Sequence, residues 1–105
     1  MGTKELEVRW TPRARESLRE VVAYWTLGEG ARPAKGQRIA RELITSCDGL
    51  GRHAEALGTV IEHPAPFPIR RGMTSDYWVY YRIRKKRGRV EILDVYHQAR
   101  RPWLG

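Results

Sequence analysis

The chain has 105 residues, enough for one domain with one hydrophobic core. Twenty Lys and Arg against twelve Asp and Glu give a formal net charge of +8, which favours polyanionic partners such as nucleic acid, an anionic membrane surface or an acidic protein. The single cysteine excludes an intramolecular disulfide and a cysteine-rich zinc site, and no apolar run is long enough for a membrane span or a signal peptide, so one cytoplasmic domain over residues 1–105 is expected, with no membrane partner.

The N-terminal segment predicts a strand that leads directly into a helix. Apolar residues alternate with charged ones over residues 6–10, as in a half-buried strand. Thr11 and Pro12 suit the start of a helix, because a threonine side chain can accept a hydrogen bond from the first-turn amides and proline needs no partner there. This helix is expected to end at Gly28. Its apolar stripe consists of Ala14, Leu18, Val21, Val22 and Trp25.

A second amphipathic helix is predicted to begin at Pro33 and to stop at Gly49 and Gly51. Cys47 lies on its apolar side and is therefore interpreted as a core residue rather than a nucleophile. The short glycine-containing link between the two helices favours an antiparallel hairpin, whose apolar stripes need a sheet to cover them. The second stripe consists of Ile39, Ala40, Leu43, Cys47 and Leu50.

The middle of the chain carries the weakest pattern. Residues 52–68 are predicted to form a loop: residues 60–61 could make a short strand, but the three prolines within residues 64–68 exclude a central strand nearby. Residues 69–73 form the next candidate strand, with Gly72 as a bulge or a bend.

The C-terminal part predicts a β-hairpin. Residues 76–84 alternate in polarity, residues 85–88 form a basic turn, and residues 89–97 are apolar on both faces, as a central strand should be. Together these elements predict an α+β fold in the order β-α-α-β-β-β, with the helical hairpin packed on one face of a largely antiparallel, twisted sheet.

The strand over residues 76–84 presents two different faces. Tyr77, Val79, Tyr81 and Ile83 share the face expected against the helices, and Trp78, Tyr80, Arg82 and Arg84 share the opposite face. Aromatic rings beside arginines can stack on bases and hold phosphates, or they can anchor an amphipathic protein segment. The same residues would also keep a sheet face soluble and suit strand propensity. The pattern leaves these three interpretations open.

Two further segments are candidates for a site. In the C-terminal run, His97 could act as a general acid or base beside Tyr96, with the following arginines neutralising charge on a phosphate, or it could simply cap the strand end. Arg70 and Arg71 could join those arginines in phosphate binding or guard an edge strand against aggregation. The histidines lie far apart without acidic residues at ligand spacing, and no phosphate-binding glycine loop occurs, so neither a metal nor a cofactor is expected.

Several of these segments, in this order, resemble the RelE/ParE superfamily of bacterial toxins. The resemblance covers most of the chain and is weakest over residues 52–66, which look longer or differently built. It rests on Val8-Arg9-Trp10-Thr11-Pro12-Arg13-Ala14 and the following helix with Leu18 and Tyr24, on Ile69-Arg70-Arg71-Gly72 through Tyr77-Trp78-Val79-Tyr80-Tyr81-Arg82-Ile83, and on Val90-Glu91-Ile92-Leu93-Asp94-Val95-Tyr96-His97 with Ala99-Arg100-Arg101.

The resemblance implies the same fold and a toxin encoded beside an antitoxin that wraps and silences it in a hetero-oligomeric complex. Two activities occur within the superfamily. RelE-like members cut messenger RNA in the ribosomal decoding site, whereas ParE-like members inhibit DNA gyrase and block replication. On the RelE-like model, Arg71 would steady the scissile phosphate and Tyr96 or His97 would handle the proton, with Arg100 beside them.

The ParE-like branch, with the wider plasmid-stabilisation group, is favoured. No lysine lies between Lys35 and Lys85, so the lysine-rich constellation of the best-known ribonucleases is missing, and the ending His97-Gln98-Ala99-Arg100-Arg101 is more similar to ParE. The expected function is therefore a non-enzymatic gyrase poison; the alternatives are a ribosome-dependent endoribonuclease and a non-toxic RNA-binding or regulatory domain. The surface expected to bind the target or the antitoxin consists of Arg70, Arg71, Trp78, Tyr80, Arg82, Arg84, Arg100, Arg101 and Trp103.

Overall fold

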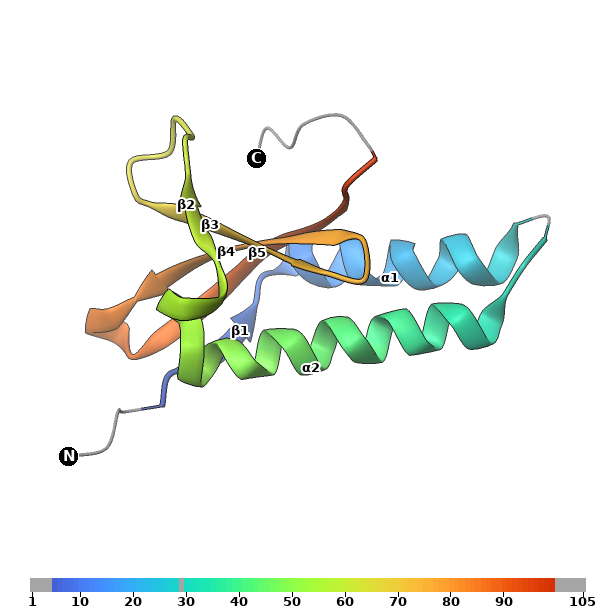
Figure 1. Ribbon diagram of the computed structural model, residues 1–105, viewed down its shortest axis with the longest axis horizontal. Coiled ribbons are helices and arrows are strands. Elements are labelled where there is room, and N and C mark those ends of the chain that lie inside the picture. Colours follow the sequence, from blue (N-terminus) through green and yellow to red (C-terminus); the bar gives the residue numbers. More distant parts are fainter. Residues whose placement is uncertain (1–4, 29, 100–105) are drawn as a thin grey trace.

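Two helices cover one face of a five-stranded sheet in the computed structural model, which describes residues 5–28 and 30–99 (Figure 1). The strands lie in the order β1-β5-β4-β3-β2, with β1 parallel to β5 and every other pair antiparallel. The predicted α+β fold and helical hairpin are confirmed. The elements are β1 (Glu7–Trp10), α1 (Pro12–Leu27), α2 (Pro33–Leu57), β2 (Thr59–Ile61), β3 (Ile69–Thr74), β4 (Tyr77–Arg84), the 3-10 turn η1 (Lys85–Arg87) and β5 (Arg89–His97).

The junction between β1 and α1 is fixed by one threonine. Thr11 Oγ1 accepts a hydrogen bond from the amide of Ala14 at 3.2 Å and donates one to the carbonyl of Ile92 at 2.8 Å. Pro12 follows at the first helical position, where its missing N–H costs nothing. The side chain that caps α1 therefore also joins the helix to the interior strand β5. The predicted start of the helix at Thr11-Pro12 is confirmed.

The second helix is longer than the sequence pattern indicates. Gly49 and Gly51, expected as its stop, lie inside α2, which continues through a kink at His53 to Leu57. Gly51 is required for a different reason: a Cβ there would lie 2.6 Å from the carbonyl oxygen of Leu6, so only glycine lets the chain before β1 pass so closely. The prediction of a helix stop was wrong because a packing requirement looked like a termination signal.

The stretch over residues 52–68 was predicted to be a loop, which is confirmed only for its last part, residues 62–68. Its first part completes α2, and Thr59–Ile61 forms β2, which pairs antiparallel with β3 at the edge of the sheet. The prolines follow β2 instead of interrupting it, so every ladder hydrogen bond can form. The structure therefore contains one strand more than the predicted β-α-α-β-β-β order.

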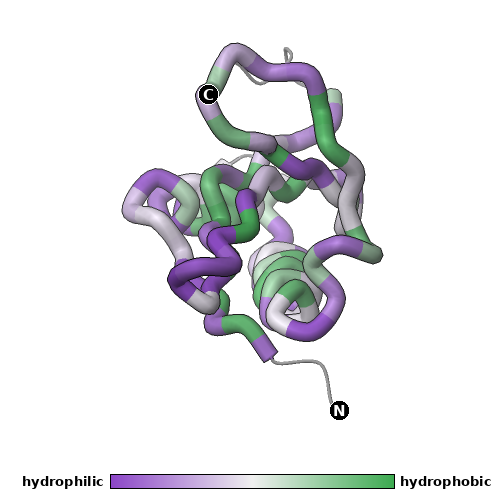
Figure 2. The backbone as a smooth tube through the Cα atoms, turned by 90° about the vertical axis from the view of Figure 1, so that its left-hand side faces the viewer, coloured by the Kyte–Doolittle hydropathy of each residue, from purple (hydrophilic) through white to green (hydrophobic). Residues whose placement is uncertain are grey.

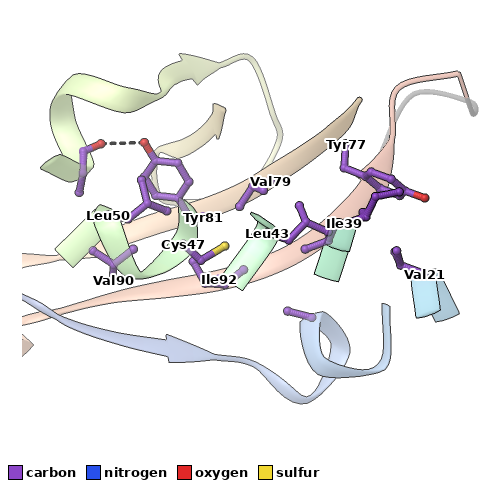
Figure 3. Close-up of a cluster of buried hydrophobic side chains, with 13 residues drawn as sticks. Val21, Ile39, Leu43, Cys47, Leu50, Tyr77, Val79, Tyr81, Val90 and Ile92 are labelled. Atoms are coloured by element: carbon purple, nitrogen blue, oxygen red, sulfur yellow. Dashed lines mark hydrogen bonds between the residues drawn. The ribbon is translucent and has the colours of Figure 1, made fainter. Parts of the chain in front are cut away.

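The core lies between the helices and the sheet (Figure 3). Tyr81, in the middle of β4, is fully buried, and its hydroxyl donates a hydrogen bond of 2.7 Å to the carbonyl of Ala54 (dashed in Figure 3). Cys47 is completely buried, and burial followed by the charge of Asp48 raises the pKa of its thiol to about 12, which supports its interpretation as a core residue. The other main core residues are Ala14, Val21, Ile39, Leu43, Leu50, Ala54, Tyr77, Val79, Val90, Ile92 and Val95.

One irregularity in the sheet decides which way the C-terminal half of β5 faces. Tyr81 pairs with Ile92 while Tyr80 pairs with Asp94, so Leu93 is an extra residue in β5. Such a bulge shifts the alternation of side chains by one position. The bulge expected at Gly72 does not occur, because the register of β3 and β4 is continuous there.

In the view along the helices, α2 is seen end-on as a coil that carries both hydrophobic and hydrophilic residues (Figure 2). Among the described residues, neither helix combines the length and apolar character needed to cross a membrane. The same residues contain no group of three or more His, Cys, Asp or Glu side chains that could hold a metal ion.

Candidate interaction surfaces

The sheet face turned away from the helices, here called the far face, carries aromatic and arginine side chains. On β4, Tyr77, Val79 and Tyr81 belong to the core, so the residues that alternate with them point to the far face. The register then places Arg71 of β3 beside Tyr80, and Tyr96 of β5 beside Trp78. The far face comprises Ile69, Arg71, Met73, Trp78, Tyr80, Arg82, Arg84, Arg89, Glu91 and Tyr96.

A stacked pair occupies the centre of the far face. The guanidinium carbon of Arg71 lies 4.0 Å from the ring centroid of Trp78, which is half-buried, and Tyr96 lies on the neighbouring strand. Met73, 46% exposed, pairs with Trp78 from the other side. This arrangement provides a flat apolar patch with one attached positive charge, which suits an anchor for a protein or nucleic-acid surface.

Tyr80 departs from the expected exposure. Its side chain is only 3% exposed, and it lies outside the main core together with the buried Ile69. Burial raises the pKa of the Tyr80 phenol in spite of a hydrogen bond and the positive charge of Arg71. The Tyr80 ring is therefore a buried part of the far face, and the expectation that it is exposed was wrong.

Arg70 and Arg71, expected to act together, point to opposite sides of the sheet. Arg70 Nη1 donates to the carbonyl of Gly58 at 2.8 Å and to that of Glu55 at 3.2 Å. These carbonyls belong to the end of α2, which has no basic residue in its last turn. Arg70 therefore caps a helix C-terminus and satisfies its free acceptors, while Arg71 stays on the far face.

His97 is also separated from Arg71. The bulge at Leu93 turns the His97 ring to the helix side, where its centroid lies 5.0 Å from that of Tyr77 in an edge-to-face contact. His97 Nδ1 accepts a hydrogen bond of 3.1 Å from the amide of Ala99. The structure thus brings Tyr96, but not His97, to the side of Arg71. The predicted Arg100, Arg101 and Trp103 lie outside the described residues.

A cluster of three arginines surrounds one carboxylate where β4 and β5 approach their turn. Glu91 accepts from Arg82 Nε at 2.7 Å, and nitrogen atoms of Arg89 and Arg84 lie 3.1 and 3.7 Å from its second oxygen. Burial alone would raise the pKa of Glu91, but the hydrogen bond from Arg82 and the charges of Arg82, Arg89 and Arg84 hold it below its usual range. One carboxylate cannot neutralise three guanidinium groups, so the cluster keeps a positive charge.

Next to this cluster lies a groove of about 880 Å³, here called the basic groove. It forms because β3 pairs with β4 only from Tyr77 to Tyr81, so the β4 edge at residues 82–84 projects beyond β3. Six of its lining residues are basic and one is acidic. The lining residues are Glu55, Val60, Phe67, Pro68, Arg70, Arg82, Ile83, Arg84, Lys85, Lys86 and Arg87.

A second groove, of about 530 Å³ and here called the acidic groove, lies between α1 and the end of β5. It opens because β1 pairs with β5 only from Arg89 to Ile92, so the following edge of β5 faces α1 directly. Its charged residues are three carboxylates and one guanidinium. The lining residues are Arg13, Glu16, Ser17, Glu20, Val21, Tyr24, Trp25, Tyr77, Asp94, Val95, Tyr96, His97 and Ala99.

Asp94 organises the wall of the acidic groove and was missed by the sequence analysis. Its side chain is 3% exposed and accepts hydrogen bonds from Arg13 Nε at 3.0 Å, from Ser17 Oγ at 2.5 Å and from the amide of Val95 at 2.8 Å. The carboxylate therefore joins α1 to the open edge of β5. An aspartate within the otherwise apolar run of residues 92–95 was the signal that could have identified it.

Comparisons with known proteins agree with this architecture. Residues 8–102 match the model of a family described as the ParE toxin of the type II toxin–antitoxin system parDE. No curated protein matches the chain at a significant level.

Solved structures of similar fold include the RelBE2 toxin–antitoxin complex of Mycobacterium tuberculosis (24% identity, TM-score 0.68, covering 91% of this chain and 94% of that one). A chain of the chromosomal ParDE system of P. aeruginosa has 16% identity and a TM-score of 0.69 over 90% of this chain and 98% of that one. A chain of the archaeal RelE–RelB complex of Pyrococcus horikoshii has 17% identity and a TM-score of 0.61 over 92% and 99%. At these identities, the structural likeness establishes a shared fold.

Proposed function

The chain belongs to the ParE toxin family of type II toxin–antitoxin systems, and from that premise we propose that it arrests bacterial growth by binding and poisoning DNA gyrase in the cytoplasm. The observation that supports a binding role is the stacked Arg71–Trp78 pair on the far face, flanked by Met73 and Tyr96. An aromatic anchor with an adjacent arginine is the residue combination that dominates protein–protein binding energies. Such a surface acts by occupying a target and needs no catalytic group.

The placement of His97 favours this function over the ribonuclease alternative. A nuclease needs its phosphate-binding arginine and its proton-transfer group around one scissile bond. Arg71 and His97 lie on opposite faces of the sheet, and only Tyr96 remains beside Arg71. Among the described residues, the far face therefore offers Arg71 and Tyr96 but lacks the histidine, which is the side chain best suited to proton transfer near neutral pH.

Inhibition of gyrase supercoiling by the purified protein tests this proposal. The double variant Arg71→Ala/Trp78→Ala should lose at least tenfold in inhibitory potency, because a central anchor typically contributes about 2 kcal/mol or more to binding. The matched control is Arg15→Ala/Tyr24→Ala on α1, which removes one arginine and one exposed aromatic ring elsewhere. Equal potency of the two double variants would contradict binding through the far face.

The same preparations separate the alternatives. A protein that leaves gyrase active but cuts messenger RNA on ribosomes would be a RelE-like nuclease, and an Arg71→Ala/His97→Ala variant would then lose its toxicity. A protein that leaves growth unaffected when it is induced without its partner would be a binding or regulatory domain.

We propose further that a cognate antitoxin neutralises this toxin through an acidic segment with apolar anchors. The structural neighbours are toxin–antitoxin complexes, and the net charge of +8 favours an acidic partner. Affinity should fall with added salt but persist, because apolar burial remains when charges are screened. An affinity that does not change with salt would argue against electrostatic complementarity.

A further inference from the structure

The basic groove is set apart from the aromatic centre of the far face by its position and its composition. It lies where the β4–β5 hairpin projects beyond β3, and its outer wall is the turn η1 (Lys85–Arg87). Gly88, whose backbone is left-handed with φ of 63°, ends this turn, and its amide donates a hydrogen bond to the carbonyl of Lys85. The basic side chains are thus held on a defined turn and on the strand end next to it.

Most of the positive charge in the groove is available to a ligand. Lys85 is paired with Glu55 at 2.5 Å, but no ion pair holds Lys86 or Arg87 within the described part of the chain, and both are exposed. On the far-face side, Arg82 and Arg84 share the single carboxylate of Glu91 with Arg89. A row of guanidinium and ammonium groups with few counterions attracts a polyanion and gains from the release of its condensed cations.

The aromatic residue of the groove indicates which kind of polyanion fits. Phe67 lies beneath Arg82, whose guanidinium carbon is 4.1 Å from the ring centroid. Arg82 therefore covers one ring face that an unpaired base would otherwise use for stacking. Arg82 is at the same time fixed by Glu91, so it presents its charge from a set position. This geometry favours contact with phosphates over stacking on bases.

We propose that the basic groove binds the sugar–phosphate backbone of duplex DNA without reading its sequence. The phosphates are held by Lys86 and Arg87 at the turn and by Arg82 and Arg84 on the adjoining strand. Duplex DNA is favoured over a single strand because its charge density is higher and Arg82 already covers one face of the Phe67 ring. This inference goes beyond the proposed inhibition of gyrase, because it requires DNA alone.

Fluorescence anisotropy with a labelled 20-base-pair duplex and the purified protein tests the proposal. The variant Lys86→Glu/Arg87→Glu should weaken binding at least tenfold, and the slope of log affinity against log salt should become shallower by about 0.9 for each phosphate that the variant no longer neutralises. The matched control Arg15→Glu/Arg41→Glu makes the same change in net charge at exposed helix positions and should keep most of the affinity. All four substituted residues are exposed, so thermal unfolding should show the same folded state in both variants.

A gain of affinity provides a second, independent readout. Glu91→Gln removes the carboxylate that is paired with Arg82, Arg84 and Arg89, so it should tighten binding to the duplex by about two- to fivefold. Loss of fold could not produce this result. An unchanged or weaker affinity would count against the assignment of this cluster to the binding site.

The remaining outcomes each decide the question. Absence of duplex binding at low salt, equal weakening by the two charge-reversal variants, or binding restricted to single-stranded DNA or RNA of the same length would overturn the proposal. The assay contains no gyrase, so this failure is distinguishable from failure of the proposed function. A toxin that inhibits gyrase but does not bind DNA would retain the far face as its site and leave the basic groove without this ligand.

Discussion

The basic groove and the acidic groove lie toward opposite ends of the β4–β5 hairpin, and they carry opposite charge. The basic groove has six basic residues and one acidic residue, whereas the acidic groove has three carboxylates and one guanidinium. Each forms where a strand extends beyond its neighbour: β4 beyond the start of β3, and β5 beyond the end of β1. A net charge of +8 therefore describes the chain but not its individual surfaces.

The two regions also differ in the role of the carboxylate next to each of them. Asp94 in the acidic groove accepts three hydrogen bonds and joins α1 to β5, so its role is structural. Glu91 beside the basic groove holds three arginines at a fixed spacing, and its own charge opposes any anion that binds there. Asp94 and Glu91 lie only three positions apart in β5. Nevertheless, we expect removal of Asp94 mainly to destabilise the fold and removal of Glu91 mainly to strengthen anion binding.

The largest expected effect follows from removing Asp94. Asp94→Ala should lower the free energy of unfolding by about 3 kcal/mol, because the charge-assisted hydrogen bonds from Arg13 and Ser17 disappear and the amide of Val95 is left without its acceptor. Urea denaturation followed by circular dichroism measures this change. Glu16→Ala, which removes an exposed carboxylate from the same groove, should cost less than about 0.5 kcal/mol. Similar losses of stability for the two variants would refute the structural role of Asp94.

A glycine at the end of α2 packs directly against the buried Tyr81. A Cβ on Gly58 would overlap the hydroxyl and ring of Tyr81, whose own hydrogen bond to Ala54 is buried. Gly58→Ala should therefore destabilise the fold by about 2 kcal/mol through overpacking, as seen in a lower melting temperature and urea midpoint. Gly49→Ala provides the control, since open space surrounds that position and alanine favours a helix by about 0.5–1 kcal/mol. If Gly58→Ala proved as stable as Gly49→Ala, the close approach to Tyr81 would be ruled out.

Local patterns in the sequence predicted the elements well where one residue's role was decided by its immediate neighbours. Thr11-Pro12 begins α1 as expected, and the alternation in β4 correctly separated core from far face. Features that depend on the packing of distant segments were not predictable. Gly51 resembled a helix stop because its true requirement, the carbonyl of Leu6, lies far away in the sequence.

The candidate site was affected by the same difficulty. A single extra residue at Leu93 reverses the facing of His97, and this parity change separates it from Arg71. The alternation of apolar and polar residues in the sequence does not reveal such a bulge. Likewise, the burial of Tyr80 depends on tertiary packing that strand alternation does not reveal, since alternation assigns a face but not its coverage.

The smallest expected effect is the contribution of Glu91 to the pH dependence of the free energy of unfolding. The pKa of Glu91 lies below its ordinary value of 4.5 in the folded protein, so the charged form favours folding. This stabilisation is fully present above pH 4.5 and is lost as the pH falls through the lower, folded-state pKa. Glu91→Gln should cost about 1 kcal/mol at pH 7 and should remove part of the decline in stability seen below pH 4.5. Urea midpoints measured from pH 7 to pH 3 for the two proteins test this, and parallel curves would show that Glu91 does not contribute to the acid sensitivity of the fold.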